Sequence, residues 1–396
     1  MTGCETCRHD WDYLRLGDRP DYEARPSRSD SITHRVSLVD LFCGCGGLSL
    51  GIAEAARQLG AALEIPLAID TDSDSLAVFA ANFPHAKIEQ KPVEELLNGA
   101  LGAPLTAGEK ELKDRVGRVD ILTGGPPCQG HSDLNNHTRR TDPRNALYER
   151  MARAAEVLEP SIVLIENVPA VVRDAAGVVD TVETALTTVG YTVNHKTLNL
   201  GELGVPQRRR RHILLACSTG SLDPGKLLSE LTAPCADHPA RSVRWAIEDL
   251  EDTAISTSFD APPSPTSENA ARIAWLFDND KYDLPNLKRP RCHRDKKHSY
   301  SSMYGRLRWD DPAQTITTGF GSMGQGRYVH PSRRRTITPH EAARLQSFPD
   351  FFDFSALSTR TALARLIGNT VPPLLSCNIA SVVIPHLTKR QLGLAA

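Results

Sequence analysis

Short apolar runs alternate with amphipathic stretches over the first half of the chain. Runs rich in Val, Ile and Leu have the length of buried strands, at Val36–Phe42, Ile65–Ile69, Val119–Thr123, Ser161–Ile165, 191–198 and 212–216. Between them, apolar residues recur at helical spacing, which predicts helices at Leu48–Leu59, through Leu76 and Phe79, at Asn145–Leu158 and near 177–189. This alternation predicts an α/β fold with a doubly wound, mixed or parallel sheet.

The pattern changes after Cys217. Residues 218–300 are rich in proline, have few periodic runs and contain the basic run Lys288–Lys297, which predicts a second domain with a local basic patch. Thr315–Gly326 alternates apolar and small residues, which predicts a strand followed by a glycine-rich loop. Helices are expected at Pro339–Gln346 and Leu374–Leu387.

Composition indicates a soluble protein of the cytoplasm. The 396-residue chain is 40% hydrophobic and 24% charged, which suits a globular enzyme, and its net charge of -2 means that any nucleic-acid surface must be local. Nine cysteines, odd in number and unevenly spaced, indicate reduced thiols. No apolar run approaches the roughly 20 residues of a membrane span, and residues 1–31 lack the apolar centre of a secretory signal.

The polar N-terminal stretch carries one pair of potential metal ligands. Cys4 and Cys7 form a single CxxC, with His9 and His34 nearby in the sequence. A structural zinc site normally needs a second pair of ligands at matching spacing. We therefore interpret this stretch as an unstructured extension and expect no metal.

One cysteine comes directly after a predicted strand. Gly124 to Gly130 reads Gly-Gly-Pro-Pro-Cys-Gln-Gly, and its glycines and prolines end the strand and stiffen the turn. Cys128 is thereby expected at the carboxyl end of a strand, where open α/β sheets bind ligands. Its thiolate would be a strong nucleophile, although this stretch alone also fits a buried structural thiol.

A glycine turn precedes the first predicted helix. Cys43-Gly44-Cys45-Gly46-Gly47 would let a ligand approach backbone amides at a helix N-terminus. The spacing is not that of a dinucleotide-binding G-x-G-x-x-G, which argues against a nicotinamide oxidoreductase. Asp70 ends the next strand about 20 residues further on, where an acid can accept hydrogen bonds from ribose hydroxyls.

Glu166 and an arginine run complete the candidate chemistry. Glu166 ends the strand expected beside the one that leads to Cys128, so the carboxylate and the thiol can share a pocket. The run Gln207–Arg211 leads into an apolar strand. On a strand's period of two, Arg209 and Arg211 lie on one side and the other two arginines on the opposite side. One of these pairs can face the ligand cleft.

Taken together, these motifs resemble the DNA (cytosine-5) methyltransferase family of the bacterial type. Six segments match in the family's order: Asp40–Gly47, Pro126–Gln129, Glu166–Val168, Gln207–Arg211, Arg335–Pro349 and Gly368–Pro373. Each is weak alone, but six in order are specific.

The resemblance implies a fold, a cofactor and a division of the chain. It implies S-adenosylmethionine as methyl donor and a cytosine flipped out of duplex DNA. It also implies four segments: a polar N-terminal extension (1–34), a catalytic domain that binds S-adenosylmethionine (35–216), a mostly β or irregular target-recognition domain (217–365), and a C-terminal segment that returns to the catalytic domain (366–396).

The resemblance also implies roles for residues. Cys128 would add to carbon-6 of cytosine, and Glu166 would hydrogen-bond the ring N3 and the exocyclic amine. Arg209 or Arg211 would lie near the pyrimidine carbonyl or hold the glutamate and the thiolate in place. The residues expected to contact the cofactor are Phe42, Gly44, Gly47, Asp70, Asn369 and Thr370.

Two alternatives remain open: a cytosine-5 methyltransferase of RNA, such as tRNA, and a non-catalytic nucleic-acid-binding relative. The sizeable variable region favours duplex DNA, and the intact Cys, Glu and Arg set favours an enzyme. The expected partners are double-stranded DNA and a cognate restriction or defence system, with the protein itself a monomer.

Overall fold

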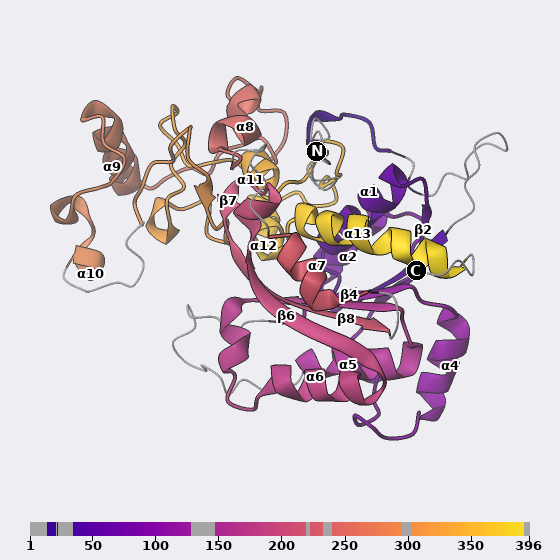
Figure 1. The fold of residues 1–396 in the computed structure, drawn as a ribbon. Helices are drawn as coiled ribbons and strands as arrows, with labels where there is room; N and C mark the ends of the chain where they lie inside the picture. The colour runs from indigo at the N-terminus through magenta and orange to yellow at the C-terminus, as the bar shows by residue number, and fades with distance from the viewer. Residues whose placement is uncertain are drawn as a thin grey trace, which may run out of the picture.

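The computed structural model describes residues 14–20, 22, 35–127, 147–218, 222–232, 240–294 and 303–391. A seven-stranded sheet lies at its centre in the order β3-β2-β1-β4-β5-β8-β6 (Figure 1). Its strands are β1 (Arg35–Leu41), β2 (Ala62–Asp70), β3 (Ile88–Gln90), β4 (Ile121–Gly124), β5 (Ile162–Asn167), β6 (Tyr191–Asn199) and β8 (Arg210–Ser218). Within this sheet β8 alone runs antiparallel to its neighbours. The predicted doubly wound α/β architecture is confirmed.

Helices cover both faces of the sheet (Figure 1). One face carries α1 (Gly47–Gln58), α2 (Ser73–Asn82), α7 (Pro224–Glu230) and α13 (Pro373–Gln391). The other carries α3 (Val93–Leu96), α4 (Ala107–Val116), α5 (Leu147–Leu158) and α6 (Val178–Thr188). Along β5, Leu164 packs into the first layer, while Val163 and Ile165 pack into the second. Burial on both faces explains why the strands read as continuous apolar runs.

The remaining elements lie mostly outside the sheet. They are α8 (Val243–Ile247), α9 (Ser267–Asp278), α10 (Arg291–Arg294), α11 (Pro339–Leu345), α12 (Arg360–Asn369), and the two-stranded pairing of β7 (Gln207–Arg208) with β9 (Ala313–Gln314). A small apolar cluster beneath α9 consists of Ile273, Leu276, Leu284, Tyr304, Met323 and Val329. This cluster is separate from the two layers that flank the sheet.

The predicted strand at Thr315–Gly326 is wrong. Strand β9 ends at Gln314, and turns with the short 3-10 helix η8 (Met323–Gln325) come after it. The backbone at Ile316 bonds side chains in place of a neighbouring strand: its N–H donates to Gln207 and its carbonyl accepts from Arg209. Alternation in the sequence shows that a segment is extended, but it does not identify its hydrogen-bond partners.

Residues 14–20 also differ from the expected unstructured extension. Leu14 is fully buried, and its carbonyl accepts from the Asp350 backbone at 3.0 Å. Arg15 donates to the Trp245 carbonyl at 2.6 Å, and Arg19 donates to that of Asn82 at 2.8 Å. Because these partners are distant in sequence, no local pattern could reveal the packing. Cys4 and Cys7 lie outside the described residues.

One helical stretch has membrane-like length and composition. Arg360–Leu387, made of α12 and most of α13, is apolar enough to cross a membrane by those two criteria. However, 72% of its most apolar window is buried inside the fold. That burial is typical of a core helix in a soluble protein, which α13 resembles in its packing along α1.

A buried arginine joins α4 to α5. The Arg153 guanidinium is 1% exposed; its Nη2 and Nε donate to the two carboxylate oxygens of Glu109 at 2.6 and 2.9 Å. Its Nη1 donates to Glu156 at 2.7 Å and to the Ala103 carbonyl at 2.8 Å. Glu109 also closes the capping box of α4 with Thr106. The Arg153 hydrogen bonds lower the pKa of Glu109 to about 2.

We expect Glu109→Gln to lower the free energy of unfolding by about 3 kcal/mol at pH 7, because it leaves a buried guanidinium without its charge partner. The folded-state pKa of Glu109 lies below its ordinary 4.5, so this stabilisation is present above pH 4.5 and is lost as the pH falls towards 2. Denaturant unfolding at several pH values measures it, with exposed Glu111→Gln on the same helix as control. Equal stability of both variants at pH 7 would contradict the prediction.

Candidate active site

Four parallel strands end at the same edge of the sheet. Leu41 pairs with both Ile69 and Gly124, and Gly124 pairs with Ile165. The side chains and turns next to these positions therefore meet in one place, as is typical of ligand crevices in open α/β sheets. The residues brought to this edge are Phe42, Asp70, Gly125 and Glu166.

The turn after β1 adopts backbone angles that favour glycine. Gly44 and Gly46 have φ of 54° and 92°, in the left-handed region, and Gly46 is the N-cap of α1. Phe42 also has a positive φ, of 56°, which costs a bulky residue about 1–3 kcal/mol. Such strain is retained where the surrounding structure enforces it, and here it shapes the rim of a cavity.

Asp70 holds this turn in place. One carboxylate oxygen accepts from the Gly44 N–H at 2.9 Å, and the other accepts from the Asp72 N–H at 3.0 Å. A carboxylate offers roughly four acceptor positions, so two backbone bonds leave capacity for hydroxyl groups of a ligand. Asp70 is partly exposed and lines the cavity.

Two glycines let the C-terminal part of the chain pack directly on α1. A Cβ on Gly47 would lie 2.3 Å from the Val371 carbonyl oxygen, and a Cβ on Gly51 would lie 2.0 Å from that of Pro373. No real Cβ makes such contacts, so only glycine allows this close approach. The sequence predicted Gly47 only as a cofactor contact and gave Gly51 no role, because both packing partners lie more than 300 residues away.

The turn at Thr370 meets the glycine turn through a thiol. The Thr370 hydroxyl donates to the Leu366 carbonyl at 2.7 Å and lies 3.2 Å from Cys45 Sγ. Burial raises the pKa of Cys45 to about 12 and that of Cys43 well above its ordinary value. Burial therefore disfavours the thiolate form at both positions, which makes these thiols poor nucleophiles.

Glu166 and Arg211 form an ion pair across neighbouring strands. Arg211 Nε on β8 lies 2.6 Å from Glu166 Oε1 on β5, with side chains only 14% and 9% exposed. The next residue on β5, Asn167, donates through its amide to the Pro126 carbonyl at 3.2 Å. This bond fixes the proline turn that leads to Cys128, and sequence reasoning assigned Asn167 no such role.

A single cavity of about 440 Å³ joins these groups. Its lining includes eight residues predicted from the sequence: Phe42, Gly44, Gly47, Asp70, Glu166, Arg211, Asn369 and Thr370. Arg209 instead is 1% exposed and donates to the carbonyls of Ile316 and Thr370. Cys128 lies outside the described residues; Pro127, which precedes it, lines the cavity.

Arg365 was not predicted, although it also lines the cavity. It pairs with Asp72 at 2.8 Å and with Asp74 at 2.7 Å, and so links α12 to the start of α2. The arginine is separated from the two acids by about 290 positions in the sequence, and nothing local marks Arg365 as part of the site.

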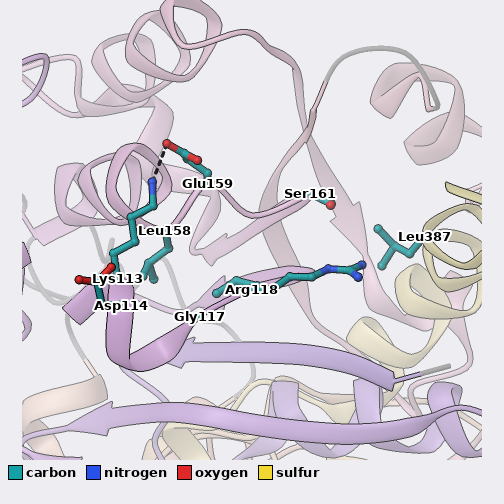
Figure 2. A pocket seen from close by; sticks show the side chains of 9 residues that line it. Lys113, Asp114, Gly117, Arg118, Leu158, Glu159, Ser161 and Leu387 are labelled. Atoms are coloured by element: carbon teal, nitrogen blue, oxygen red, sulfur yellow. Dashed lines mark ion pairs between the residues drawn. The ribbon is translucent and has the colours of Figure 1, made fainter. Parts of the chain in front are cut away.

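A second cavity, of about 650 Å³, lies at the opposite ends of the strands (Figure 2). Its charged lining residues are largely paired: Lys113 contacts Glu159 at 2.7 Å, and Arg118 pairs with Asp120. None of the predicted site residues that the structure describes lines it. The described part of the chain also gathers no group of three or more His, Cys, Asp or Glu side chains suited to a metal.

Comparison with known proteins gives a consistent result. Residues 36–384 match the family model of C-5 cytosine-specific DNA methylases. The chain is 45% identical over 372 residues to the Type II methyltransferase M1.BsuMI of Bacillus subtilis, covering 94% of this chain and 84% of that protein. It is 30% identical over 359 residues to the Type II methylase M.HgiDII of Herpetosiphon aurantiacus, covering 88% and 94% respectively.

A solved structure shows the same fold at lower identity. The Dnmt2 methyltransferase of S. pombe superposes with a TM-score of 0.61 at 18% identity, covering 89% of this chain and 99% of that one. At that identity the likeness concerns the fold alone.

We expect Gly51→Ala to lower the free energy of unfolding by about 1–3 kcal/mol, because the added methyl group must push α13 away from α1. Thermal unfolding measures it. Gly108→Ala is the matched control: that Cβ would meet no heavy atom within 4 Å, so this variant should keep or slightly raise stability. An unchanged midpoint for Gly51→Ala would show that the two helices do not pack as described.

Proposed function

The chain belongs to the family of C-5 cytosine-specific DNA methylases, and from that membership we propose that it transfers a methyl group from S-adenosylmethionine to carbon-5 of cytosine in a specific duplex DNA sequence. The observation that carries the proposal is the single cavity in which Asp70 and Thr370 meet Glu166 and Arg211. It connects a site suited to a nucleoside cofactor with a site suited to a pyrimidine.

The residues on one side of the cavity fit S-adenosylmethionine. Asp70 retains acceptor capacity for ribose hydroxyls, while Asn369, Thr370 and the Gly44–Gly47 turn offer further polar groups. Phe42 contributes an apolar wall. When bound there, the cofactor supplies an electrophilic methyl group carried on a sulfonium.

Cys128 and Glu166 act on the cytosine in this proposal. The Cys128 thiolate forms a bond to carbon-6, and the electrons of the 5,6 double bond move to carbon-5, which becomes nucleophilic. Glu166 accepts from the exocyclic amine and, when protonated, donates to N3, which stabilises the charge that the addition creates. Loss of the carbon-5 proton and departure of the Cys128 sulfur later restore the double bond.

Arg211 orients Glu166 in the proposal. Its Nε approaches Glu166 Oε1 at 2.6 Å, so the carboxyl group keeps one rotamer and presents its second oxygen to the base. Arg211 lines the same cavity and can also donate to the pyrimidine carbonyl. Arg209 is absent from the lining of this cavity and donates to the Thr370 carbonyl behind it.

We further propose that residues 217–365 recognise the DNA target and that residues 366–396 complete the cofactor site. Relatives named Type II methyltransferases support a cognate restriction or defence nuclease as functional partner. In the same proposal the enzyme acts in the cytoplasm, as a monomer on double-stranded DNA. The match to a DNA methylase family favours DNA over RNA as the substrate.

Replacing the proposed nucleophile should abolish methyl transfer. We expect Cys128→Ser to lose transfer of labelled methyl from S-adenosylmethionine to duplex DNA, because a serine hydroxyl remains protonated at neutral pH. We also expect the wild-type protein to form a denaturant-stable adduct with DNA that contains 5-fluorocytosine. Exposed Cys292→Ser serves as the control. Full turnover by Cys128→Ser, or faster methylation of tRNA than of DNA, would overturn the proposal.

Replacing the proposed acid should slow the chemical step. We expect Glu166→Gln to lower kcat on duplex DNA by about 10²-fold or more, because the amide can neither carry the proton to N3 nor pair with Arg211. The affinity for S-adenosylhomocysteine, measured by calorimetry, should stay within about twofold. Glu183→Gln, on α6 and outside the lining of the cavity, is the matched control. A kcat within twofold of wild type would remove Glu166 from the mechanism.

A further inference from the structure

Three buried polar side chains form a connected network behind the cavity. Gln207, Arg209 and Gln346 are each at most 1% exposed. Gln207 donates to the Gln346 side-chain oxygen at 2.7 Å and to the Leu345 carbonyl at 2.9 Å. Gln207 lies on β7, Arg209 lies between β7 and β8, and Gln346 caps the end of α11.

The network ends on two backbone positions. At Ile316, the N–H donates to Gln207 at 3.1 Å and the carbonyl accepts from Arg209 at 2.9 Å. At Thr370, the carbonyl accepts from Arg209 at 3.0 Å and from Gln346 at 3.4 Å. Gln346 also donates to the Ile367 carbonyl at 2.7 Å. Two side chains therefore hold one peptide group of the turn that lines the cavity.

Simple core packing does not account for this arrangement. Apolar side chains of similar size would fill the same space, whereas a buried guanidinium is costly unless donors and acceptors match. What the network adds is direction, because the bonds from Arg209 and Gln346 fix where the Thr370 carbonyl lies. On the other side of Thr370, its hydroxyl contacts Cys45 and its Cγ2 methyl group lies close to Gly47.

The opposite end of the cavity is held independently. Glu166 is fixed by β5 and by Arg211 on β8, and the proline turn is fixed by Asn167. A disturbance of the Thr370 turn should therefore reach the cofactor side without displacing Glu166 or Arg211.

We propose that Gln346 and Arg209 are positioning residues that set the Thr370 turn for cofactor binding, a role that rests on the proposed function. In this role Arg209 does not touch the pyrimidine and acts through the Thr370 carbonyl. Ile316, which lies in the proposed target-recognition region, holds Arg209 directly and holds Gln346 through Gln207.

The test is calorimetric binding of S-adenosylhomocysteine to the full-length protein. We expect Gln346→Met to weaken binding about tenfold, because the Thr370 carbonyl loses one of its two side-chain donors, while kcat at saturating S-adenosylmethionine stays within about twofold. Arg209→Lys, which keeps the charge but can reach fewer carbonyls, should weaken binding by a smaller factor. Arg153→Lys is the matched control, since it alters another buried arginine away from the cavity and should leave binding unchanged.

The outcomes separate this inference from the proposed function. If Gln346→Met and Arg209→Lys both bind as tightly as wild type, or lose kcat with binding unchanged, the positioning role is overturned. If Gln346→Met does not fold, as judged by thermal unfolding, Arg209→Lys decides the question by the same criteria. Failure of the wild-type protein to bind S-adenosylhomocysteine would overturn the proposed function itself.

Discussion

The parallel register of β1, β2, β4 and β5 is the constraint on which the site depends. It ends four strands at one edge, where side-chain hydrogen bonds and an ion pair then hold the neighbouring turns and side chains. Asp70 holds the glycine turn, Asn167 holds the proline turn, and Arg211 meets Glu166. A slip of one residue in a strand would turn its side chains to the opposite face and separate these groups. The chemistry is therefore supported by strand pairing more than by any single loop.

Much of this arrangement could be predicted because its signals are local. Strands buried on both faces appear as short apolar runs, and β1, β4 and β5 lie close to their expected positions. Glu166 and Asp70 could be singled out because polar residues at strand ends meet at one edge of a parallel sheet. The family resemblance then related these separate motifs to one another. It also pointed to Asn369 and Thr370, which no local pattern connects to the first strand.

The parts that escaped prediction depend on contacts between distant segments. Thr315–Gly326 alternates like a strand, but Gln207 and Arg209 satisfy its backbone at Ile316 in place of a neighbouring strand. Leu14 is fully buried, and its carbonyl accepts from the backbone of Asp350, more than 300 positions away. Arg209 and Arg211 share one side of an extended chain, yet Arg211 faces the cavity and Arg209 faces two carbonyls behind it. The period of two predicts which side of a strand a side chain lies on, but it does not predict which groups that side chain will contact.

The position of α13 has a consequence for biosynthesis. The cavity needs the turn at Thr370–Pro373, which is synthesised after every strand of the sheet. At about 5–20 residues per second, a ribosome adds that turn tens of seconds after the first strand has emerged. During this interval the nascent chain carries the glycine turn and Asp70 without the wall that encloses them. A ligand that needs this wall therefore cannot assist the early steps of folding.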